Sequence, residues 1–275
     1  MAAEPYLYPL ASGSQGNALL AGANGTRVLV DAGMGRRRMT AALSEIGLGS
    51  QDIDAVFLTH THGDHIRSSA VGFCLAGNVP LYSAAENIAY LTGAMRGFKK
   101  LLAAGLARPI DGEAVTVGQI TAEAFPVPHD SPGVCHGFRL TLGRGRGRRR
   151  AAVATDLGHL PTGATGHLLD ADAVVLESNH DPQMLRASGR PATLIERIAG
   201  PDGHLSNAAA AEALAEVVGR SRPGRVQNVV LAHLSQDCNT AQLALEAQAF
   251  LARRPGERLR LFVASQHVPG PRIAL

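Results

Sequence analysis

The sequence has no tryptophan, and aromatic residues make up only 4% of its 275 residues. Its three cysteines, Cys74, Cys135 and Cys238, are odd in number and far apart, which argues against a disulfide framework and favours a reducing compartment. No run reaches the roughly 18 apolar residues that span a bilayer, and the first residues lack the basic and apolar stretches of a signal peptide. We therefore expect a cytoplasmic protein with no membrane partner.

Charge of neither sign dominates the sequence. The 26 Lys and Arg residues against 23 Asp and Glu residues give a net charge of +3, which leans toward anionic partners without identifying one. A hydrophobic content of 45% is enough for one sizeable core or two small ones. Because no internal repeat and no linker interrupts the sequence, we expect a single domain over residues 1–275.

Short apolar runs between glycine turns indicate strands, and these runs form two clusters along the chain. The first cluster covers residues 7–31 and 54–58, and the second begins near residue 115 and continues past residue 233 to a last strand at residues 258–264. Residues 34–46, between the two parts of the first cluster, have the apolar spacing of a helix. Strand clusters flanked by helices predict an α+β or α/β fold, in which two sheets are covered by outer helices.

The strongest chemical signal is the segment THTHGDH at residues 59–65. In extended chain, His60 and His62 share a face, and Gly63 permits a turn that places Asp64 and His65 where the next helix is expected to begin. Three imidazoles and a carboxylate in six residues are costly to bury unless a cation pairs with them. The alternative is a solvated, histidine-rich turn.

Three further residues follow apolar strands that lie far from this segment. His129 ends the run ITAEAFPVPH, Asp156 ends RRAAVATD, and His233 ends VQNVVLAH. Each alone is more typical of a surface or core residue than of a ligand, but together with the cluster they form a set. Asp31 also ends a strand, and we expect it to support the histidine-rich loop through hydrogen bonds.

Seven ligands exceed the four that a single tetrahedral zinc accepts, and two ions that share a carboxylate satisfy the count. The first ion is assigned to His60, His62 and His129, and the second to Asp64, His65 and His233, with Asp156 between them. Ligation rich in imidazole favours zinc, with manganese as the alternative because oxygen ligands are also present. The sequence therefore predicts two divalent metal ions.

This ligand pattern resembles the metallo-β-lactamase fold family, whose His-x-His-x-Asp-His hallmark matches residues 60–65. The resemblance covers essentially the whole chain and implies a four-layer αβ/βα sandwich with the metals at one edge, between the two sheets. The hallmark is specific for the fold and poorly specific for the substrate.

Five other stretches are similar to the YycJ/WalJ-like branch of that family. They are SGSQGNA from Ser12, TDLG from Thr155, LESNHD from Leu176, GHLSN from Gly203 and LAHLSQDCNT from Leu231. The branch implies a metal-dependent phosphodiesterase, a 5′→3′ exonuclease that acts on DNA in preference to RNA. Only 76 residues separate Asp156 from His233, so we expect no β-CASP domain to be inserted there.

Three residues are candidates for catalysis. Asp64 can orient the nucleophile or take its proton while it remains a ligand. His204 resembles the accessory histidine of tRNA-processing relatives, and it can donate to a phosphate oxygen or protonate the leaving group. Glu177 can orient His204. The alternative for His204 is a surface residue at the start of a helix.

Two regions are candidates for phosphate binding. Ser12, Ser14 and Asn17 lie in a glycine-rich turn that can offer amides and hydroxyls to an anion, or that is simply a tight structural turn. The only dense basic run, expected at a hairpin tip, can follow a nucleic-acid backbone or remain a solvated loop. It consists of Arg144, Arg146, Arg148, Arg149 and Arg150. The lack of tryptophan argues against base stacking along a single strand.

Two other functions remain open from the sequence. One is hydrolysis of a small ester, thioester or lactam on the same metals. The other is a non-catalytic metal-binding scaffold, which a missing ligand would favour, and no expected ligand is missing here.

Overall fold

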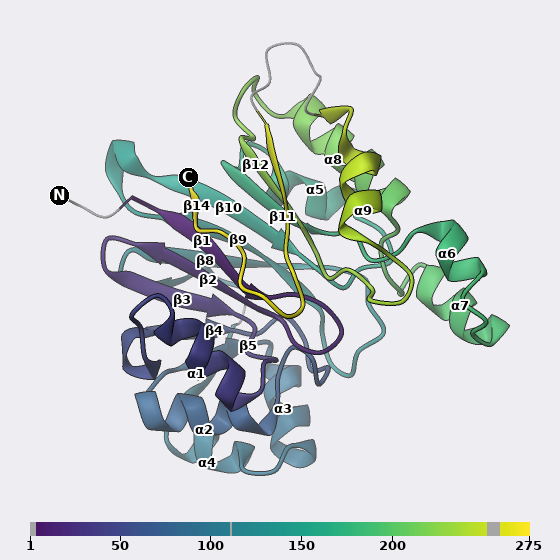
Figure 1. Cartoon of the computed structure of the whole chain (residues 1–275). Coiled ribbons are helices and arrows are strands. Elements are labelled where there is room, and N and C mark those ends of the chain that lie inside the picture. Colours follow the sequence, from purple (N-terminus) through teal and green to yellow (C-terminus); the bar gives the residue numbers. More distant parts are fainter. Residues whose placement is uncertain (1–3, 111, 252–258) are drawn as a thin grey trace.

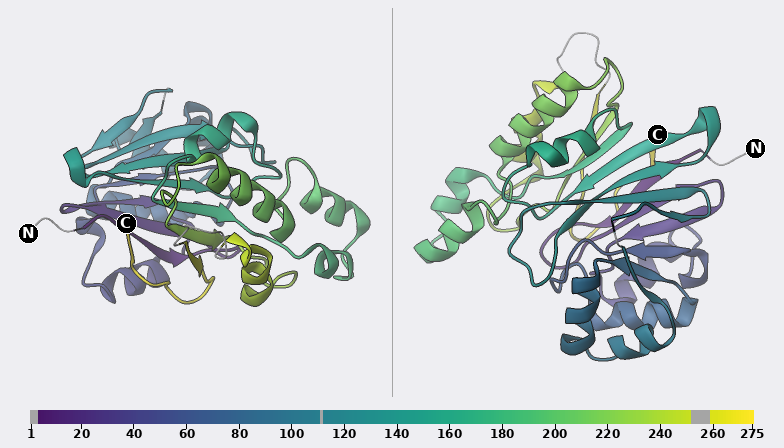
Figure 2. Two further views of the ribbon diagram at one scale, coloured as in Figure 1. Left: turned by 90° about the horizontal axis from the view of Figure 1, so that it is seen from above. Right: turned by 180° about the vertical axis from the view of Figure 1, so that it is seen from behind.

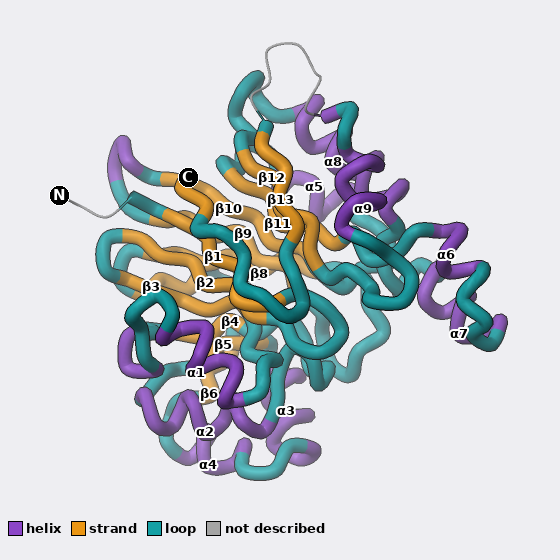
Figure 3. The backbone as a smooth tube through the Cα atoms, viewed as in Figure 1, coloured by secondary structure: helices purple, strands orange, loops and turns teal. Residues whose placement is uncertain are grey.

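The computed structural model describes residues 4–110, 112–251 and 259–275, and within them two seven-stranded sheets lie face to face (Figures 1 and 3). In the first sheet the strand order is β14 (Ile273–Ala274), β1 (Tyr6–Ala11), β2 (Ala18–Ala23), β3 (Thr26–Val30), β4 (Ala55–Phe57), β5 (Leu81–Ser83) and β6 (Ala107–Pro109). In the second the order is β13 (Arg260–Val263), β12 (Asn228–Ala232), β11 (Ala173–Glu177), β10 (Arg149–Ala154), β9 (His136–Leu142), β8 (Ile120–Pro126) and β7 (Val115–Val117).

Helices cover the outer faces of both sheets. Those over the first sheet are α1 (Arg36–Ser44), α2 (Ser68–Gly77), α3 (Ala85–Ala94) and α4 (Phe98–Ala103). Those over the second sheet are α5 (Thr162–Leu168), α8 (Asn207–Arg220) and α9 (Ala241–Gln248). The remaining helices, α6 (Pro182–Arg186) and α7 (Ala192–Ala199), project from the sandwich in every view (Figures 1 and 2). Two short 3₁₀ turns cover Ser50–Asp52 and Gly145–Gly147.

Three apolar clusters separate the four layers. In β2, Leu19 packs between the sheets and Leu20 packs under the helices of the first sheet, because successive strand residues point to opposite faces. Phe57 and Phe138 meet in the cluster between the sheets, with ring centroids 5.6 Å apart. The third cluster lies under α5, α8 and α9. The prediction of two sheets covered by outer helices is confirmed.

Parallel pairing brings the ends of distant strands to one edge of the sandwich. β3 pairs in parallel with β4, and β10, β11 and β12 pair in parallel with one another. The carboxyl ends of parallel strands meet at the same edge of a sheet, which is where ligands bind in open α/β sheets. The segments that follow these five strands therefore lie together, although they are spread from residue 31 to residue 233.

Some boundaries differ from the sequence prediction. Helix α2 begins at Ser68, so Asp64 and His65 lie in a turn closed by a hydrogen bond from His65 N to His62 O and not at a helix start. The helix is delayed because Ile66 first pairs with Ala32 in an isolated bridge. The strand before His129 ends at Pro126, three residues earlier than expected. None of the helices described here has the length and apolar character needed to cross a membrane.

Candidate metal centre

Three polar residues that follow strands adopt left-handed backbone conformations. Asp31 has φ 65°, Asp156 has φ 58° and His233 has φ 54°, after β3, β10 and β12 respectively. This conformation is uncommon outside glycine, and it costs free energy that the surrounding structure must offset. At each of these three residues, the left-handed backbone directs the polar side chain toward the space at the ends of the two sheets. Backbone strain of this kind gathers at functional sites.

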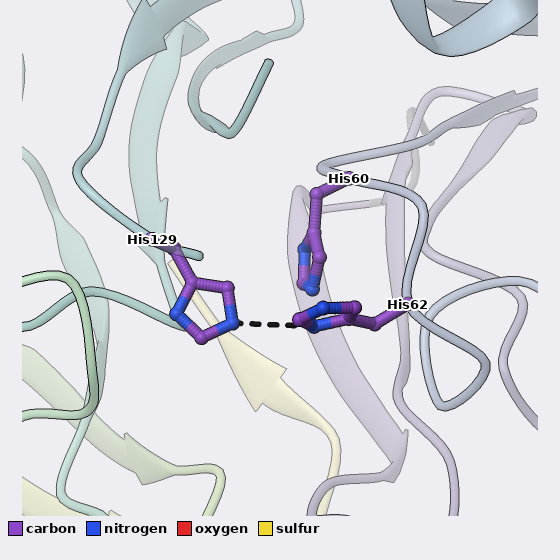
Figure 4. A group of neighbouring side chains, drawn as sticks. All are labelled: His60, His62 and His129. Carbon is purple, nitrogen blue, oxygen red and sulfur yellow. Dashed lines mark hydrogen bonds between the residues drawn. The ribbon is translucent and has the colours of Figure 1, made fainter. Parts of the chain in front are cut away.

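The first group of side chains consists of His60, His62 and His129, whose rings point toward one another (Figure 4). His62 Nδ1 lies 3.3 Å from His129 Nε2, and the ring centroid of His60 lies 4.8 Å from that of His62 and 5.1 Å from that of His129. In His60 and His129, the ring nitrogen that faces away from the group has a hydrogen-bond partner. His60 Nδ1 lies 3.0 Å from Thr59 Oγ1, and His129 Nδ1 donates to Gly203 O over 2.9 Å.

The second group consists of Asp64, His65, Asp156 and His233, and its ligand atoms all lie within 4.8 Å of one another. His65 Nε2 lies 3.0 Å from Asp156 Oδ2, and His233 Nε2 lies 3.2 Å from Asp64 Oδ2. Asp156 also links the two groups, because its Oδ1 is 3.8 Å from His129 Nε2. The structure thus brings together all seven residues of the predicted set, with Asp156 within reach of both groups.

Buried carboxylates fix the orientation of two imidazoles in the second group. His65 Nδ1 donates to Asp31 Oδ2 over 2.8 Å, and His233 Nδ1 donates to Glu177 Oε1 over 2.7 Å. Each of these bonds leaves Nε2 directed into the site, which is the arrangement that carboxylate–histidine pairs give to metal ligands. Asp31 also accepts from the backbone and hydroxyl of Thr59, so its predicted supporting role agrees with the geometry.

The pKa values of the imidazoles differ between the first and the second group. Burial lowers the pKa of His60 well below its ordinary value and lowers that of His62, so both imidazoles are neutral near pH 7. Burial acts in the same direction on His233, but Asp156 and the neighbouring carboxylates raise its pKa to about 10. Burial would raise the pKa of Asp156, but the charges of His233 and the other imidazoles hold it well below its ordinary value. Burial also opposes the charged form of His65, but Asp156 and Asp31 raise its pKa well above the ordinary value. Cations bind carboxylates and neutral imidazoles, so a cation in the second group would displace the protons that His65 and His233 carry near pH 7.

A further observation indicates that a divalent cation fits this donor set. His60 Nε2 is buried and, among the described residues, has no hydrogen-bond partner, although its ring is fixed through Nδ1. A buried nitrogen lone pair without a partner costs free energy, and a cation between the three imidazoles of the first group would satisfy it.

Residues 26–233 match the beta-lactamase superfamily domain. Exodeoxyribonuclease WalJ of Streptococcus pneumoniae serotype 2 (strain D39 / NCTC 7466) is 32% identical over 240 residues, which cover 86% of this chain and 83% of WalJ. Exodeoxyribonuclease YycJ of Bacillus anthracis is 32% identical over 239 residues, which cover 86% of this chain and 84% of YycJ. This chain belongs to the beta-lactamase superfamily, in its WalJ/YycJ branch.

The fold agrees with that assignment. The crystal structure of the metallo-beta-lactamase fold protein YhfI from Bacillus subtilis superposes with a TM-score of 0.66 at 16% identity, over 97% of this chain and 99% of YhfI. The four-layer αβ/βα sandwich predicted from the resemblance is confirmed. As a member of this superfamily the chain is a metal-dependent hydrolase, and its histidine and aspartate clusters suit divalent metal ions.

A cavity of about 340 Å³ opens over the two groups of the superfamily site. His204 lines it, and the ring centroid of His204 lies 5.0 Å from that of His129. Arg190 and Arg197 also line the cavity from the α6–α7 region and were not predicted. Nothing in the sequence separates these two arginines from other surface arginines, because only the projection of α7 over the site gives them this position.

The glycine-rich turn near the N-terminus divides into two parts. The side chains of Ser12 and Asn17 are buried and bonded internally: Ser12 Oγ accepts from His233 N over 2.8 Å, and Asn17 Oδ1 accepts from Gly13 N over 2.8 Å. The tight-turn alternative therefore holds for these two residues. Ser14 is exposed and lines the cavity, so it alone retains the predicted position for a phosphate contact.

The arginine run lies far from the site. Arg144, Arg146 and Arg148 occupy the turn between β9 and β10, at the end of the sheet opposite to α6 and α7 (Figure 1). Largely extended chain from Arg148 to Asp156 spans about 25 Å at roughly 3.3 Å per residue. These arginines do not line the cavity, and a role for them in backbone binding stays a prediction.

Gly33 makes the metal-binding turn possible by a close backbone approach. A Cβ at this position would lie 1.7 Å from the carbonyl oxygen of Asp64. We expect Gly33→Ala to lower the free energy of unfolding by about 1–3 kcal/mol, the usual cost of overpacking, as measured by urea denaturation. Gly35→Ala is the control, because its Cβ would meet no atom within 4 Å. Equal stability of the two variants would contradict this account.

Proposed function

We propose that this chain is a dinuclear metal-dependent phosphodiesterase that degrades DNA from the 5′ end. The observation that carries the proposal is the position of Asp156, with one oxygen 3.0 Å from His65 Nε2 and the other 3.8 Å from His129 Nε2. A single carboxylate that reaches two groups of imidazoles is suited to a pair of cations. The names of WalJ and YycJ, both exodeoxyribonucleases, support DNA as the substrate.

Seven residues would hold the two ions. His60, His62 and His129 would bind the first, Asp64, His65 and His233 would bind the second, and Asp156 would contact both. Zinc is the first choice for these ligands and manganese the second. When bound, the ions would neutralise charge on the phosphate oxygens and lower the pKa of an attacking water.

The chain's own residues then position the nucleophile and the leaving group. Asp64, exposed to the cavity beside His233, would orient the attacking water and accept its proton. His204 faces the same cavity, and its Nδ1 donates to Glu177 Oε1 over 2.9 Å, so its Nε2 is available to protonate the leaving oxygen or to donate to a phosphate oxygen. Both groups lie beside the cation ligands, where the charge of the reaction develops.

Glu177 holds two of these imidazoles at once. It is fully buried; its Oε1 accepts from His204 and His233, and its Oε2 accepts from the backbone N–H groups of Leu157 and Leu205. Burial would raise the pKa of Glu177, but the charge and hydrogen bond of His204 and the hydrogen bond of His233 lower it to about 2, so it is ionised. Glu177 is therefore a positioning residue for both histidines.

The amide of Glu177→Gln cannot accept from all four donors, because its nitrogen only donates. We expect metal affinity and turnover to fall about 10–100-fold, and stability to fall by about 1–3 kcal/mol. Metal titration, kinetics and urea unfolding measure these three effects. Glu216→Gln is the control, since Glu216 is exposed on α8 and pairs with the exposed Arg220 of the same helix. Wild-type metal affinity in Glu177→Gln would remove the positioning role.

The proposed function is tested with purified protein loaded with zinc or manganese. Single-stranded and duplex DNA labelled at either end, RNA, bis(p-nitrophenyl) phosphate and a chromogenic lactam are offered in parallel. We expect 5′-labelled DNA to release its label early as a short product, while 3′-labelled DNA shortens progressively. Lactam turnover without any phosphodiester cleavage would reject the proposal in favour of a small-molecule hydrolase.

A further inference from the structure

A second groove adjoins the metal-centre cavity on the side of the first sheet. It has a volume of about 790 Å³ and lies between the turn at residues 61–68 and the end of α3. Ser14 and Asp64 line both this space, called here the α3 groove, and the metal-centre cavity. A ligand that crosses the metal centre can therefore continue directly into the α3 groove.

The α3 groove carries two arginines that pair with no carboxylate of the described residues. Arg67 Nη2 donates to Gln15 O over 3.0 Å, which fixes the side chain without an ion pair to any described residue. Arg96 is exposed and has no hydrogen bond or ion pair with any residue of the described ranges. Both arginines line the groove.

The arginines on the other side of the metal centre differ in this respect. Arg190 pairs with Asp237 over 2.9 Å, and Arg197 pairs with Asp130. A phosphate on that side must compete with a carboxylate that is already in place. The uncompensated positive charge next to the metal centre thus lies in the α3 groove.

Tyr90 adds an aromatic surface to the same groove. Its side chain is 43% exposed and lines the groove beside Met95, above the buried Leu91. Among the described residues, Tyr90 and Phe250 are the two aromatic side chains that are this exposed, and only Tyr90 adjoins the site. An exposed ring next to unpaired arginines is the combination by which proteins hold single-stranded nucleic acid.

We propose that the α3 groove binds the nucleotides of single-stranded DNA next to the scissile phosphate, with a base stacked on Tyr90 and the backbone phosphates contacting Arg67 and Arg96. This inference rests on the proposed function and specifies the form of its substrate. A base within a duplex is already stacked on both faces, so the ring of Tyr90 is useful only to an unpaired base. The groove therefore favours single strands, or duplex ends that have opened.

Kinetics on two substrates test the groove. Bis(p-nitrophenyl) phosphate has no nucleotides to occupy it, whereas a 5′-phosphorylated oligothymidylate of about twelve nucleotides extends along it. We expect Tyr90→Ala to raise KM for the oligonucleotide about tenfold and to leave KM for the small diester unchanged. Tyr90→Phe should restore the wild-type KM because it keeps the ring. Phe250→Ala is the matched control for an equally exposed aromatic residue.

Salt dependence tests the arginines separately. Arg96→Ala should flatten the slope of log KM against log salt concentration by about 0.7, the contribution of one phosphate contact on a single strand. Arg37→Ala removes an exposed arginine of α1 that lines neither cavity, and it should leave the slope unchanged.

Binding is also measured directly, by the quenching of tyrosine fluorescence when the oligonucleotide is added to the metal-loaded protein, since the chain has no tryptophan to mask it. Quenching that is lost in Tyr90→Ala supports the groove. Unchanged oligonucleotide KM and unchanged binding in both Tyr90→Ala and Arg96→Ala would overturn it. A wild-type protein that cleaves no phosphodiester would instead overturn the proposed function, and the binding measurement would still decide the groove.

Discussion

Asp156→Asn is expected to lower phosphodiester hydrolysis by about 1,000-fold or more. The two oxygens of Asp156 face His65 and His129, and asparagine has one oxygen and one amide nitrogen, which cannot contact two cations. Metal ions contribute several kcal/mol to the stabilisation of a charged transition state, and each 1.36 kcal/mol is a factor of ten in rate. Turnover of bis(p-nitrophenyl) phosphate and the number of metal ions per chain measure the effect.

The backbone at Asp156 calls for a matched control, because its φ of 58° is left-handed. Asparagine accepts this conformation readily, so Asp156→Asn removes the ligand with little added strain. Asp170 has the same φ of 58° but pairs with Arg222 away from the site. Asp170→Asn should keep wild-type turnover. A fully active Asp156→Asn protein with two bound ions would refute the shared role of this carboxylate.

His204→Ala is expected to lower kcat for DNA by about 10²–10⁴-fold, the usual contribution of a general acid, without loss of either metal ion. His204 also lies in a third cluster with Asp156, Glu177 and His233, but its Nδ1 donates to Glu177 Oε1 over 2.9 Å. The metals should remain because His204 is not among the seven residues assigned to the two ions. The defect should shrink on bis(p-nitrophenyl) phosphate, because a nitrophenolate leaves without protonation. A structural role of His204, or donation to a phosphate oxygen alone, would impair both substrates equally, so a smaller defect on the nitrophenyl diester is specific to protonation of the leaving group.

His159→Ala is the neighbouring control for this prediction. His159 is exposed, and its Nδ1 donates to Pro201 O over 3.1 Å, outside the cavity. We expect its turnover and metal content to equal those of the wild type. Full turnover in His204→Ala would remove this residue from the mechanism.

The seven residues of the metal centre could be predicted because ligand chemistry leaves a distinct trace in the sequence. Three histidines and an aspartate within His60–His65 have few alternatives, and single polar residues after apolar runs stand out at Asp156 and His233. Parallel pairing then brings these strand ends together. Asp31 could be assigned a supporting role for the same reason, because it follows the strand β3.

Other parts of the site depend on tertiary placement, which leaves no local pattern. The run near Arg146 is the densest basic segment, yet it lies at the opposite end of β10 from Asp156, separated by about 25 Å of extended chain. Arg67 and Arg96 are isolated in the sequence, and they share a groove only because α3 packs beside the metal-binding turn. The absence of tryptophan argues against base stacking, and only the exposure of Tyr90 in the α3 groove makes stacking there a proposal.

Short elements were also beyond the sequence prediction. β6 covers three residues and β14 covers two, and each is a strand only because it pairs with β5 or β1. Helix α6 has five residues and starts where the side chain of Asp181 accepts from two backbone N–H groups. Segments this short have no apolar periodicity of their own, so pairing and capping decide their conformation.

The central claim is that one set of seven side chains holds two cations. Anomalous diffraction from crystals of the zinc-loaded protein, collected at the zinc edge, tests it directly. The account predicts two peaks, one about 2.0–2.2 Å from ligand atoms of His60, His62 and His129 and one at that distance from Asp64, His65 and His233, with Asp156 in contact with both. A single peak, or a second peak that Asp156 does not contact, would contradict it.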